Sequence, residues 1–222
     1  MDSQGITGNF SEAGVEALAV VVFKDEKVSS GVLKDLDQLT GGQIAAVFNS
    51  EEFKGEPGET SLFRLTPKGA AKATRLLLVG AGDKAEYKLP DVAVASGTAT
   101  RFLRKCNARN FAFSPRFEGD AAATAQAAVQ GAVTSQFELD KYKTKDKNDK
   151  SINKIVVFVE GAKPADLKRG LNRGQIIGDS INFTRDLANE PPNILTPTEM
   201  ANRAQKMAKE TGLKIEVLDE AR

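Results

Sequence analysis

The sequence has no histidine and no tryptophan, and it has a single cysteine, Cys106. One cysteine excludes an internal disulfide and fits a reducing compartment. Because no imidazole is present to activate a thiol, we interpret Cys106 as a small apolar residue near the end of a helix rather than as a nucleophile. Any metal ion would have to be held by carboxylates, together with an amine or a carbonyl oxygen.

Neither sign of charge is in excess, because 31 lysines and arginines stand against 30 aspartates and glutamates, for a net charge of +1. Such a balance supplies no global field that would draw the protein onto nucleic acid or anionic lipid. No apolar run approaches the ~18 residues that a membrane span needs. The first residues also lack the basic start and apolar core of a secretory signal. We therefore expect a cytoplasmic protein that binds neither membrane nor nucleic acid.

The sequence does contain short apolar runs separated by longer segments with helical character. The run ALAVVVFK at 17–24 is rich in β-branched residues, which is typical of a strand covered on both faces. We predict strands at residues 17–24, 60–65, 74–80, 110–114 and 153–159. We predict helices at residues 36–53, 90–107, 120–139 and 164–189. Helical connections of this length predict the α/β class, with a mixed, mostly parallel sheet and helices on both faces.

A further helix and strand are predicted near the end of the chain. Residues 196–211 begin with Thr196 as a cap and Pro197 at the first helical position, and Gly212 follows the last turn. Residues 213–218, LKIEVL, alternate between apolar and charged side chains, which indicates a strand. Such a strand could add an edge to the first sheet or begin a second sheet, and the sequence leaves both open.

A glycine-rich turn follows the predicted strand at 74–80. Gly80-Ala-Gly82 and Ala85 match the Gly-x-Gly-x-x-Gly/Ala spacing that lets backbone approach a pyrophosphate. The acidic ribose ligand expected ~20 residues later is missing, and Pro90 delays the following helix. We interpret the motif as a tight turn at the end of a buried strand.

A lysine-rich loop lies between the predicted helix at 120–139 and the next strand. Its basic residues are Lys141, Lys143, Lys145, Lys147 and Lys150, with Tyr142 among them. This composition could contact phosphates and stack a base. Asp140, Asp146 and Asp149 cancel much of the charge, so we interpret the segment as a solvated loop.

Other acidic residues and motifs offer little for catalysis. The neighbouring carboxylates are Glu51 and Glu52, Glu118 and Asp120, and Asp219 and Glu220. They lie in polar stretches, where surface charge explains them better than a metal site. The sequence contains neither a Gly-x-Ser-x-Gly elbow nor a phosphate-binding P-loop, which removes two common classes of enzyme.

The most specific signal is the stretch 181–197, INFTRDLANEPPNILTP. It closely resembles the signature ARDLVNEPPNxLTP of the leucyl aminopeptidases, the cytosolic M17 metallopeptidases. Residues 198–219 are similar to the helix and strand that follow in that family, and LLLVGAGD at 76–83 is similar to its VLLVGLG strand and turn. The twin prolines also force an extended, stiff exit from the preceding helix.

The resemblance implies three segments. Residues 1–165 would be an N-terminal α/β domain similar to macro domains, 166–190 a linking helix, and 191–222 the start of the catalytic metallopeptidase domain, whose remainder the chain does not contain. It further implies that the parent enzyme releases N-terminal amino acids from peptides with two divalent ions, manganese or zinc. The parent would assemble as a hexamer in the cytoplasm.

The residues that perform this chemistry in the family are not found here. Its metal ligands are a lysine, aspartates and a glutamate, with the motifs KGxTFDSGG and NTDAEGR, and neither motif occurs between Met1 and Arg222. We therefore expect no catalytic residue, no cofactor-binding residue and no metal ligand in the chain, and a structural, positioning role. The alternatives are a macro-like module that binds a nucleotide or ADP-ribose at Gly80-Ala-Gly82, and a DNA-binding accessory domain.

Overall fold

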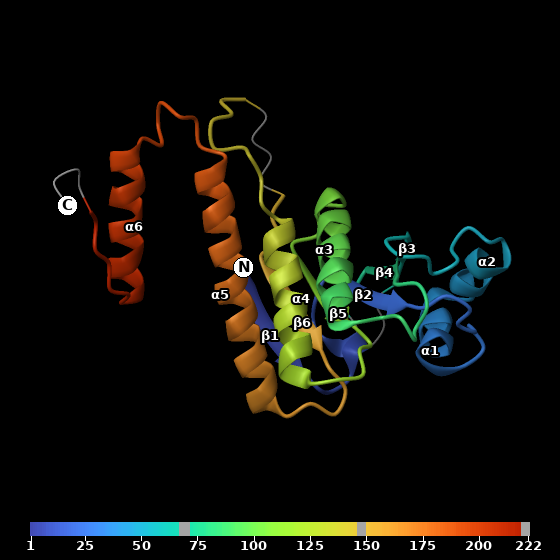
Figure 1. Cartoon of the computed structure of the whole chain (residues 1–222). Coiled ribbons are helices and arrows are strands. Elements are labelled where there is room, and N and C mark those ends of the chain that lie inside the picture. Colours follow the sequence, from blue (N-terminus) through green and yellow to red (C-terminus); the bar gives the residue numbers. More distant parts are fainter. Residues whose placement is uncertain (67–71, 146–149, 219–222) are drawn as a thin grey trace. The chain divides into compact units, whose positions relative to one another are not determined.

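The computed structural model describes residues 1–66, 72–145 and 150–218 (Figure 1). It divides into two compact units, Met1–Asp179 and Ser180–Arg222. Within the described ranges, no helix combines the length and the apolar character that crossing a membrane requires.

The first unit is built on one six-stranded sheet with the order β1-β6-β5-β2-β4-β3. Its strands are β1 (Asp2–Ile6), β2 (Ala17–Val22), β3 (Thr60–Arg64), β4 (Arg75–Gly80), β5 (Asn110–Ser114) and β6 (Lys154–Phe158). Every neighbouring pair is parallel except β3 and β4, which are antiparallel. The sheet is therefore mixed and mostly parallel, as the sequence predicts.

Helices cover both faces of this sheet, which confirms the predicted α/β class. The helices of the first unit are α1 (Gly31–Thr40), α2 (Gln43–Asn49), α3 (Leu89–Lys105), α4 (Ala121–Ser135) and the first part of α5 (Pro164–Ala188), with a short 3-10 turn η1 (Phe10–Glu12). On one face, Val21 and Leu77 of the strands pack in a cluster with residues of α3, α4 and α5. On the other, Val20 and Leu78 pack with Leu33 of α1 and with α2.

Strand β2 shows why the sheet forms where it does. All six of its residues are buried, and they pair with β4 on one side and with β5 on the other. A central strand needs apolar side chains on both faces, and the continuous apolar run from Leu18 to Val22 meets that need.

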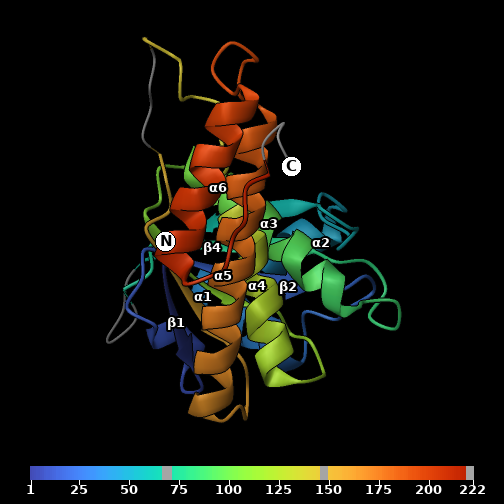
Figure 2. The same ribbon diagram turned by 60° about the vertical axis from the view of Figure 1, so that its left-hand side comes forward.

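Glycines allow the three helices on one face to pack very closely. A Cβ built on Gly131 of α4 would overlap the carbonyl group of Ala93 in α3, and one on Gly170 of α5 would overlap that of Ala122 in α4. Figures 1 and 2 both show α5 running beside α4. The glycines therefore set the backbone separation in this layer.

Two local predictions from the sequence are wrong, and one strand has no counterpart among the predictions. The helix expected at 36–53 is split into α1 and α2, because Gly41 and Gly42 both have left-handed backbone angles (φ +67° and +88°). Strand β1 is not foreseen by the sequence. The strand expected at 213–218 is absent: these residues have no regular structure and pair with no described strand. A strand needs a partner for its hydrogen bonds, whatever its side-chain pattern.

The second unit contains the end of α5, the proline-rich loop and α6 (Pro197–Thr211). As predicted, the Thr196 hydroxyl caps α6 by accepting from the Glu199 amide (3.3 Å), and Pro197 occupies the first turn. Gly212 ends the helix with a φ of +74°. The start and stop signals in the sequence therefore position this helix correctly.

Candidate functional site

The glycine turn after β4 is required by close packing of backbone. A Cβ on Gly80 would lie 2.7 Å from the carbonyl carbon of Gly55, and Gly82 has a φ of +74°. The Gly82 amide donates to the Gly55 carbonyl (2.8 Å), and the Gly82 carbonyl accepts from the Lys24 amide (2.9 Å). These glycines therefore serve a tight turn that joins three segments, which agrees with the interpretation from the sequence.

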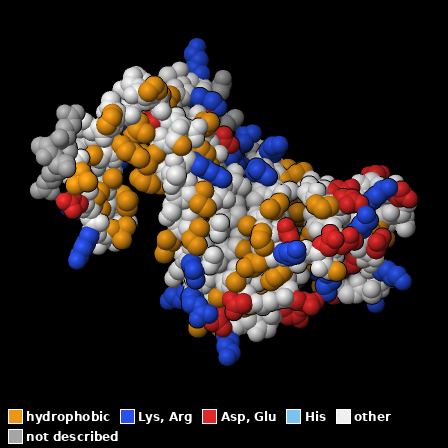
Figure 3. Space-filling model, viewed as in Figure 1, with side chains coloured by type: hydrophobic (Ala, Val, Ile, Leu, Met, Phe, Trp, Pro, Cys, Tyr) orange, Lys and Arg blue, Asp and Glu red, His pale blue; other side chains and the backbone are white. Residues whose placement is uncertain are grey.

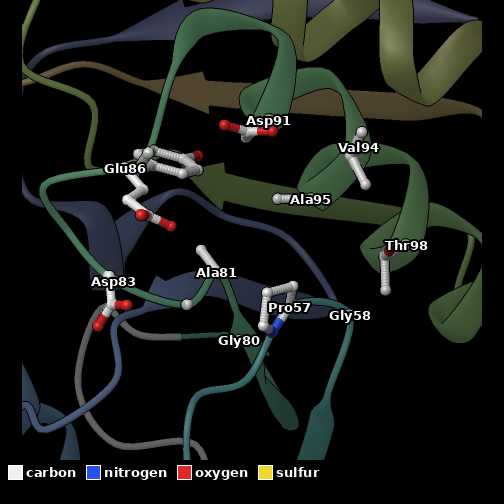
Figure 4. A pocket seen from close by; sticks show the side chains of 12 residues that line it. Pro57, Gly58, Gly80, Ala81, Asp83, Glu86, Asp91, Val94, Ala95 and Thr98 are labelled. Carbon is white, nitrogen blue, oxygen red and sulfur yellow. The ribbon is translucent and has the colours of Figure 1, made fainter.

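A small cavity of about 230 Å³ opens beside this turn (Figure 4). Asp83 and Glu86 in the loop after β4 and Asp91 in the first turn of α3 contribute carboxylates to it, while Pro57 and Val94 supply apolar surface. None of the twelve described residues that line this cavity is a lysine or an arginine. Phosphate groups are bound by cations and backbone amides, so the lining has the wrong charge for a pyrophosphate.

A larger cavity of about 510 Å³ lies where β2, β5 and β6 end, and Arg116 and Phe23 line it. Arg116 has a φ of +49°, which is uncommon for a residue with a side chain. Its guanidinium donates to Glu26 (2.8 Å) and to the Val21 carbonyl (3.0 Å) and lies 5.4 Å from the centre of the Phe23 ring. The cation therefore holds the β2 and β5 ends together and is already neutralised.

Tyr87 is buried and lines the smaller cavity. Its hydroxyl donates to the Pro115 carbonyl (3.1 Å), and its ring packs edge-on against Phe23, with 5.2 Å between the ring centres. Burial raises the pKa of the Tyr87 hydroxyl above its usual value of 10.0, and the negative charge of Asp91 adds to the effect. Tyr87 is therefore a neutral structural residue and not an acid or base for chemistry near pH 7.

The lysine-rich loop does not form a coherent basic surface in the described residues. Lys143 pairs with Asp140, and the Lys141 ammonium lies 5.7 Å from the centre of the Tyr142 ring. Lys147, Asp146 and Asp149 lie outside the described residues. In a different part of the molecule, around α1 and α2, the face shown in Figure 3 carries acidic and basic side chains side by side. Such mixing offers little for a phosphate backbone.

Three of the candidate carboxylates take part in local ion pairs or a helix cap. Glu51 pairs with Lys54 (2.7 Å), Glu118 pairs with Lys84 (2.6 Å), and Asp120 caps α4 by accepting from the Ala123 amide. The interactions with lysine lower the pKa of Glu51 and of Glu118. Asp219 and Glu220 lie outside the described residues.

A pair of divalent ions therefore does not fit the donors that the structure places. Within 1–66, 72–145 and 150–218, no group of three or more acidic or cysteine side chains is arranged to hold a metal ion. Cys106 is half-buried at the end of α3, where the sequence predicts it. The structure therefore assigns no metal ligand among the residues that it describes.

The second unit contains an ion-pair network, centred on one buried carboxylate of the proline-rich loop, that the sequence does not predict. The Glu190 side chain is only 1% exposed, and the Arg203 Nη1 atom of α6 donates to its Oε1 atom at 2.7 Å. Arg203 also donates through Nε to Glu199 (2.8 Å). Hydrogen bonds to Glu199 and Glu190 raise the pKa of Arg203, and the hydrogen bond from Arg203 lowers the pKa of Glu199.

Comparison with known families gives two matches. Residues 19–146 match the family model described as cytosol aminopeptidase family, N-terminal domain. Residues 182–222 match the model described as cytosol aminopeptidase family, catalytic domain. The two matches lie on opposite sides of the division between the two structural units.

Curated relatives are similar over nearly the whole chain. A probable cytosol aminopeptidase of Solibacter usitatus is 38% identical over 204 residues, which cover 92% of this chain and 39% of the relative. The cytosol aminopeptidase of Pseudomonas aeruginosa is 32% identical over 208 residues, covering 91% of this chain and 41% of the relative. The chain thus spans about two fifths of the length of these relatives.

Solved structures support the fold. A mutant of tomato leucine aminopeptidase superposes with a TM-score of 0.81 at 21% identity, covering 95% of this chain and 42% of that chain. The bottromycin maturation enzyme BotP in complex with Mn superposes with a TM-score of 0.64 at 21% identity, covering 89% of this chain and 37% of that chain. At this level of identity the likeness shows a shared fold.

Proposed function

We propose a function from the finding that the chain belongs to the cytosol aminopeptidase family. In this proposal the chain is part of a metal-dependent leucyl aminopeptidase: it comprises the non-catalytic N-terminal domain and the beginning of the catalytic domain. One observation carries this proposal: residues 19–146 match the N-terminal domain of the family, and residues 182–222, further along the same chain, match its catalytic domain. The proposed segments are the N-terminal domain at 1–165, the linking helix at 166–190 and the start of the catalytic domain at 191–222.

The role that we propose for the first unit is to support and position the catalytic domain. Its sheet is covered on both faces, and its two apolar clusters are complete within the unit. Helix α5 packs on this unit through Leu167 and Leu171 and then continues as one helix to Ala188. A helical linker has a fixed rise per residue and is less extensible than a flexible coil, which suits it to the proposed positioning role.

The chemistry of the whole enzyme is likewise a proposal. The parent would release N-terminal amino acids from peptides, with two divalent ions bound outside this chain, and would work in the cytoplasm as a homo-oligomer, with a hexamer as the proposed state. A pair of metal ions supplies charge stabilisation and an activated water to such a reaction. The donors that the structure describes do not fit that pair, and the family's ligand motifs do not occur in the sequence, so we expect the chain alone to be inactive.

A chimera tests the positioning role. Residues 1–188 would replace the corresponding N-terminal part of the Solibacter usitatus relative, and leucyl chromogenic hydrolysis and assembly size by light scattering would be measured. We expect the chimera to keep both, and the relative without any N-terminal part to lose one or both. A chimera that also carries Gly131→Ala, which disturbs the first unit, is the matched control. A chimera that behaves like the relative without its N-terminal part would contradict the proposal.

The two alternative functions have less support from the geometry. The cavity at Gly80-Ala-Gly82 is lined by Asp83, Glu86 and Asp91, which repel the pyrophosphate of ADP-ribose. Calorimetry with ADP-ribose and NAD, and a gel-shift series with DNA at low salt, would test the nucleotide-binding and DNA-binding functions. Saturable binding of either ligand would favour that alternative, whereas we expect neither.

A further inference from the structure

The glutamate of the Asn-Glu-Pro-Pro sequence has an unusual environment. Glu190 is the second residue after α5, in a unit whose other charged residues are mostly exposed, yet its side chain is only 1% exposed. Removing a carboxylate from water is costly unless a cation and hydrogen bonds compensate for the lost hydration. Burial at this position therefore calls for a specific partner.

Arg203 supplies such a partner from the second turn of α6, 13 residues further along the chain. The guanidinium uses two different nitrogens: Nη1 donates to Glu190 (2.7 Å) and Nε donates to Glu199 (2.8 Å). The rigid planar fork of arginine fixes the directions of both bonds at once, which a lysine ammonium does not do. One side chain thus connects the end of α5 to the first turn of α6.

The backbone between these carboxylates forms a tight turn. The amides of Ile194 and Leu195 both donate to the carbonyl of Pro191 at 2.9 Å, and the Met200 amide donates to the Thr196 carbonyl at 2.9 Å. The prolines restrict the chain locally, but they do not fix the direction in which α6 leaves the turn. A contact between Glu190 and α6 does fix that direction.

We infer that Arg203 is a positioning residue that clamps the start of α6 to the proline-rich turn, with Glu190 as its buried counter-ion and Glu199 as the second arm. All three residues lie in the region that matches the catalytic domain, residues 182–222. Through this clamp, the proline-rich turn and α6 hold a fixed orientation relative to each other. This inference does not depend on the proposed function, because it concerns the second unit itself and requires no peptidase activity.

Hydrogen–deuterium exchange of the whole chain tests the clamp. The readout is the exchange rate of the segment 191–200, which contains the amides of Ile194, Leu195 and Met200. The variants are Arg203→Met, Glu190→Gln and Glu199→Gln. Lys206→Met is the matched control, because Lys206 also lies on α6 and faces Glu210 at 4.0 Å, with both side chains largely exposed.

We expect Arg203→Met to accelerate exchange in this segment by about 10-fold or more, since hydrogen bonds to charged groups are the stronger ones and local opening controls exchange. Glu190→Gln should accelerate it to an intermediate degree, and Glu199→Gln least, because Glu199 is 39% exposed. Lys206→Met should leave the exchange rate of 191–200 unchanged. None of the variants should change the exchange rates of the amides in β2 and β5. Arg203→Lys, which keeps the charge but not the fork, should restore only part of the protection.

Two results would overturn the inference. One is exchange of 191–200 in Arg203→Met at the rate of the unmodified chain. The other is a Glu199→Gln effect larger than that of Glu190→Gln, because the buried counter-ion would then not be the principal arm. If Arg203→Met does not yield folded protein, the comparison of Glu190→Gln with Lys206→Met decides alone, and equal exchange in these two would reject the clamp.

Discussion

Gly131 of α4 faces the backbone of Ala93 in α3 so closely that an added Cβ would lie 2.7 Å from the Ala93 carbonyl carbon. Glycine in the middle of a helix normally costs about 1 kcal/mol relative to alanine. Gly131→Ala should nevertheless destabilise the protein, because overpacking against rigid backbone costs about 1–3 kcal/mol or more. We expect the melting temperature to fall by roughly 5 °C, measured by circular dichroism.

Gly8→Ala is the control for this prediction, since no atom lies within 4 Å of the position where its Cβ would be built. Its melting temperature should match that of the unmodified protein. A Gly131→Ala variant that is as stable as the Gly8→Ala variant would show that the contact between α3 and α4 is looser than described.

Asp120 caps α4 by accepting a hydrogen bond from the Ala123 amide at 2.7 Å. Asp120→Ala removes this bond and leaves an amide of the first turn without its partner, which should cost about 1 kcal/mol of unfolding free energy. Asp120→Asn keeps an accepting oxygen and should cost much less. Urea unfolding of both variants measures the difference, and equal midpoints for the two would contradict a capping role.

Tyr87 should make the protein less stable at alkaline pH. Its pKa is raised in the folded state, mainly by burial, so its contribution to stability is fully present below the unfolded pKa of about 10 and declines as the pH rises beyond that value. At pH 11 the loss should be about 1 kcal/mol. Tyr87→Phe should be about 1 kcal/mol less stable than the unmodified protein at pH 7, because it lacks the hydrogen bond to Pro115.

The measurement is urea unfolding of both proteins at pH 7 and pH 11. The difference between them should shrink or vanish at the higher pH, because only the unmodified protein loses stability through Tyr87. Tyr142→Phe at pH 7 is the control, since Tyr142 is 51% exposed, and it should change the unfolding free energy by less than about 0.5 kcal/mol. A difference between Tyr87→Phe and the unmodified protein that is the same at both pH values would contradict the burial of a neutral hydroxyl.

The sequence predicts those elements whose signal is local. Strand β2 is predictable because its whole length is apolar, and α6 because Thr196, Pro197 and Gly212 mark both of its ends. Strand β1 reads DSQGI, without apolar alternation, and exists through its parallel pairing with β6, from which it is separated by most of the unit. Pairing over such a distance leaves no local pattern to recognise.

The candidate sites follow the same division. The glycine turn at Gly80 is predictable, because its spacing and the preceding strand are both visible in the sequence. The positive φ of Arg116 is not predictable, because nothing in the local sequence indicates it. The pairing of Arg116 with Glu26 is not predictable either, because the two residues are far apart along the chain. The pairing of Glu190 with Arg203 is also hidden, because it depends on the direction in which α6 leaves the proline turn.

Metal-dependent hydrolysis of leucine p-nitroanilide by the purified chain tests the central claim most directly. The assay would add Mn²⁺ or Zn²⁺, with a mock purification as the background and the full-length Pseudomonas aeruginosa relative as the positive control. If the chain is the non-catalytic part of its family's enzyme, its rate should equal the background while the relative is active. A rate above the background that a chelator abolishes would contradict the account.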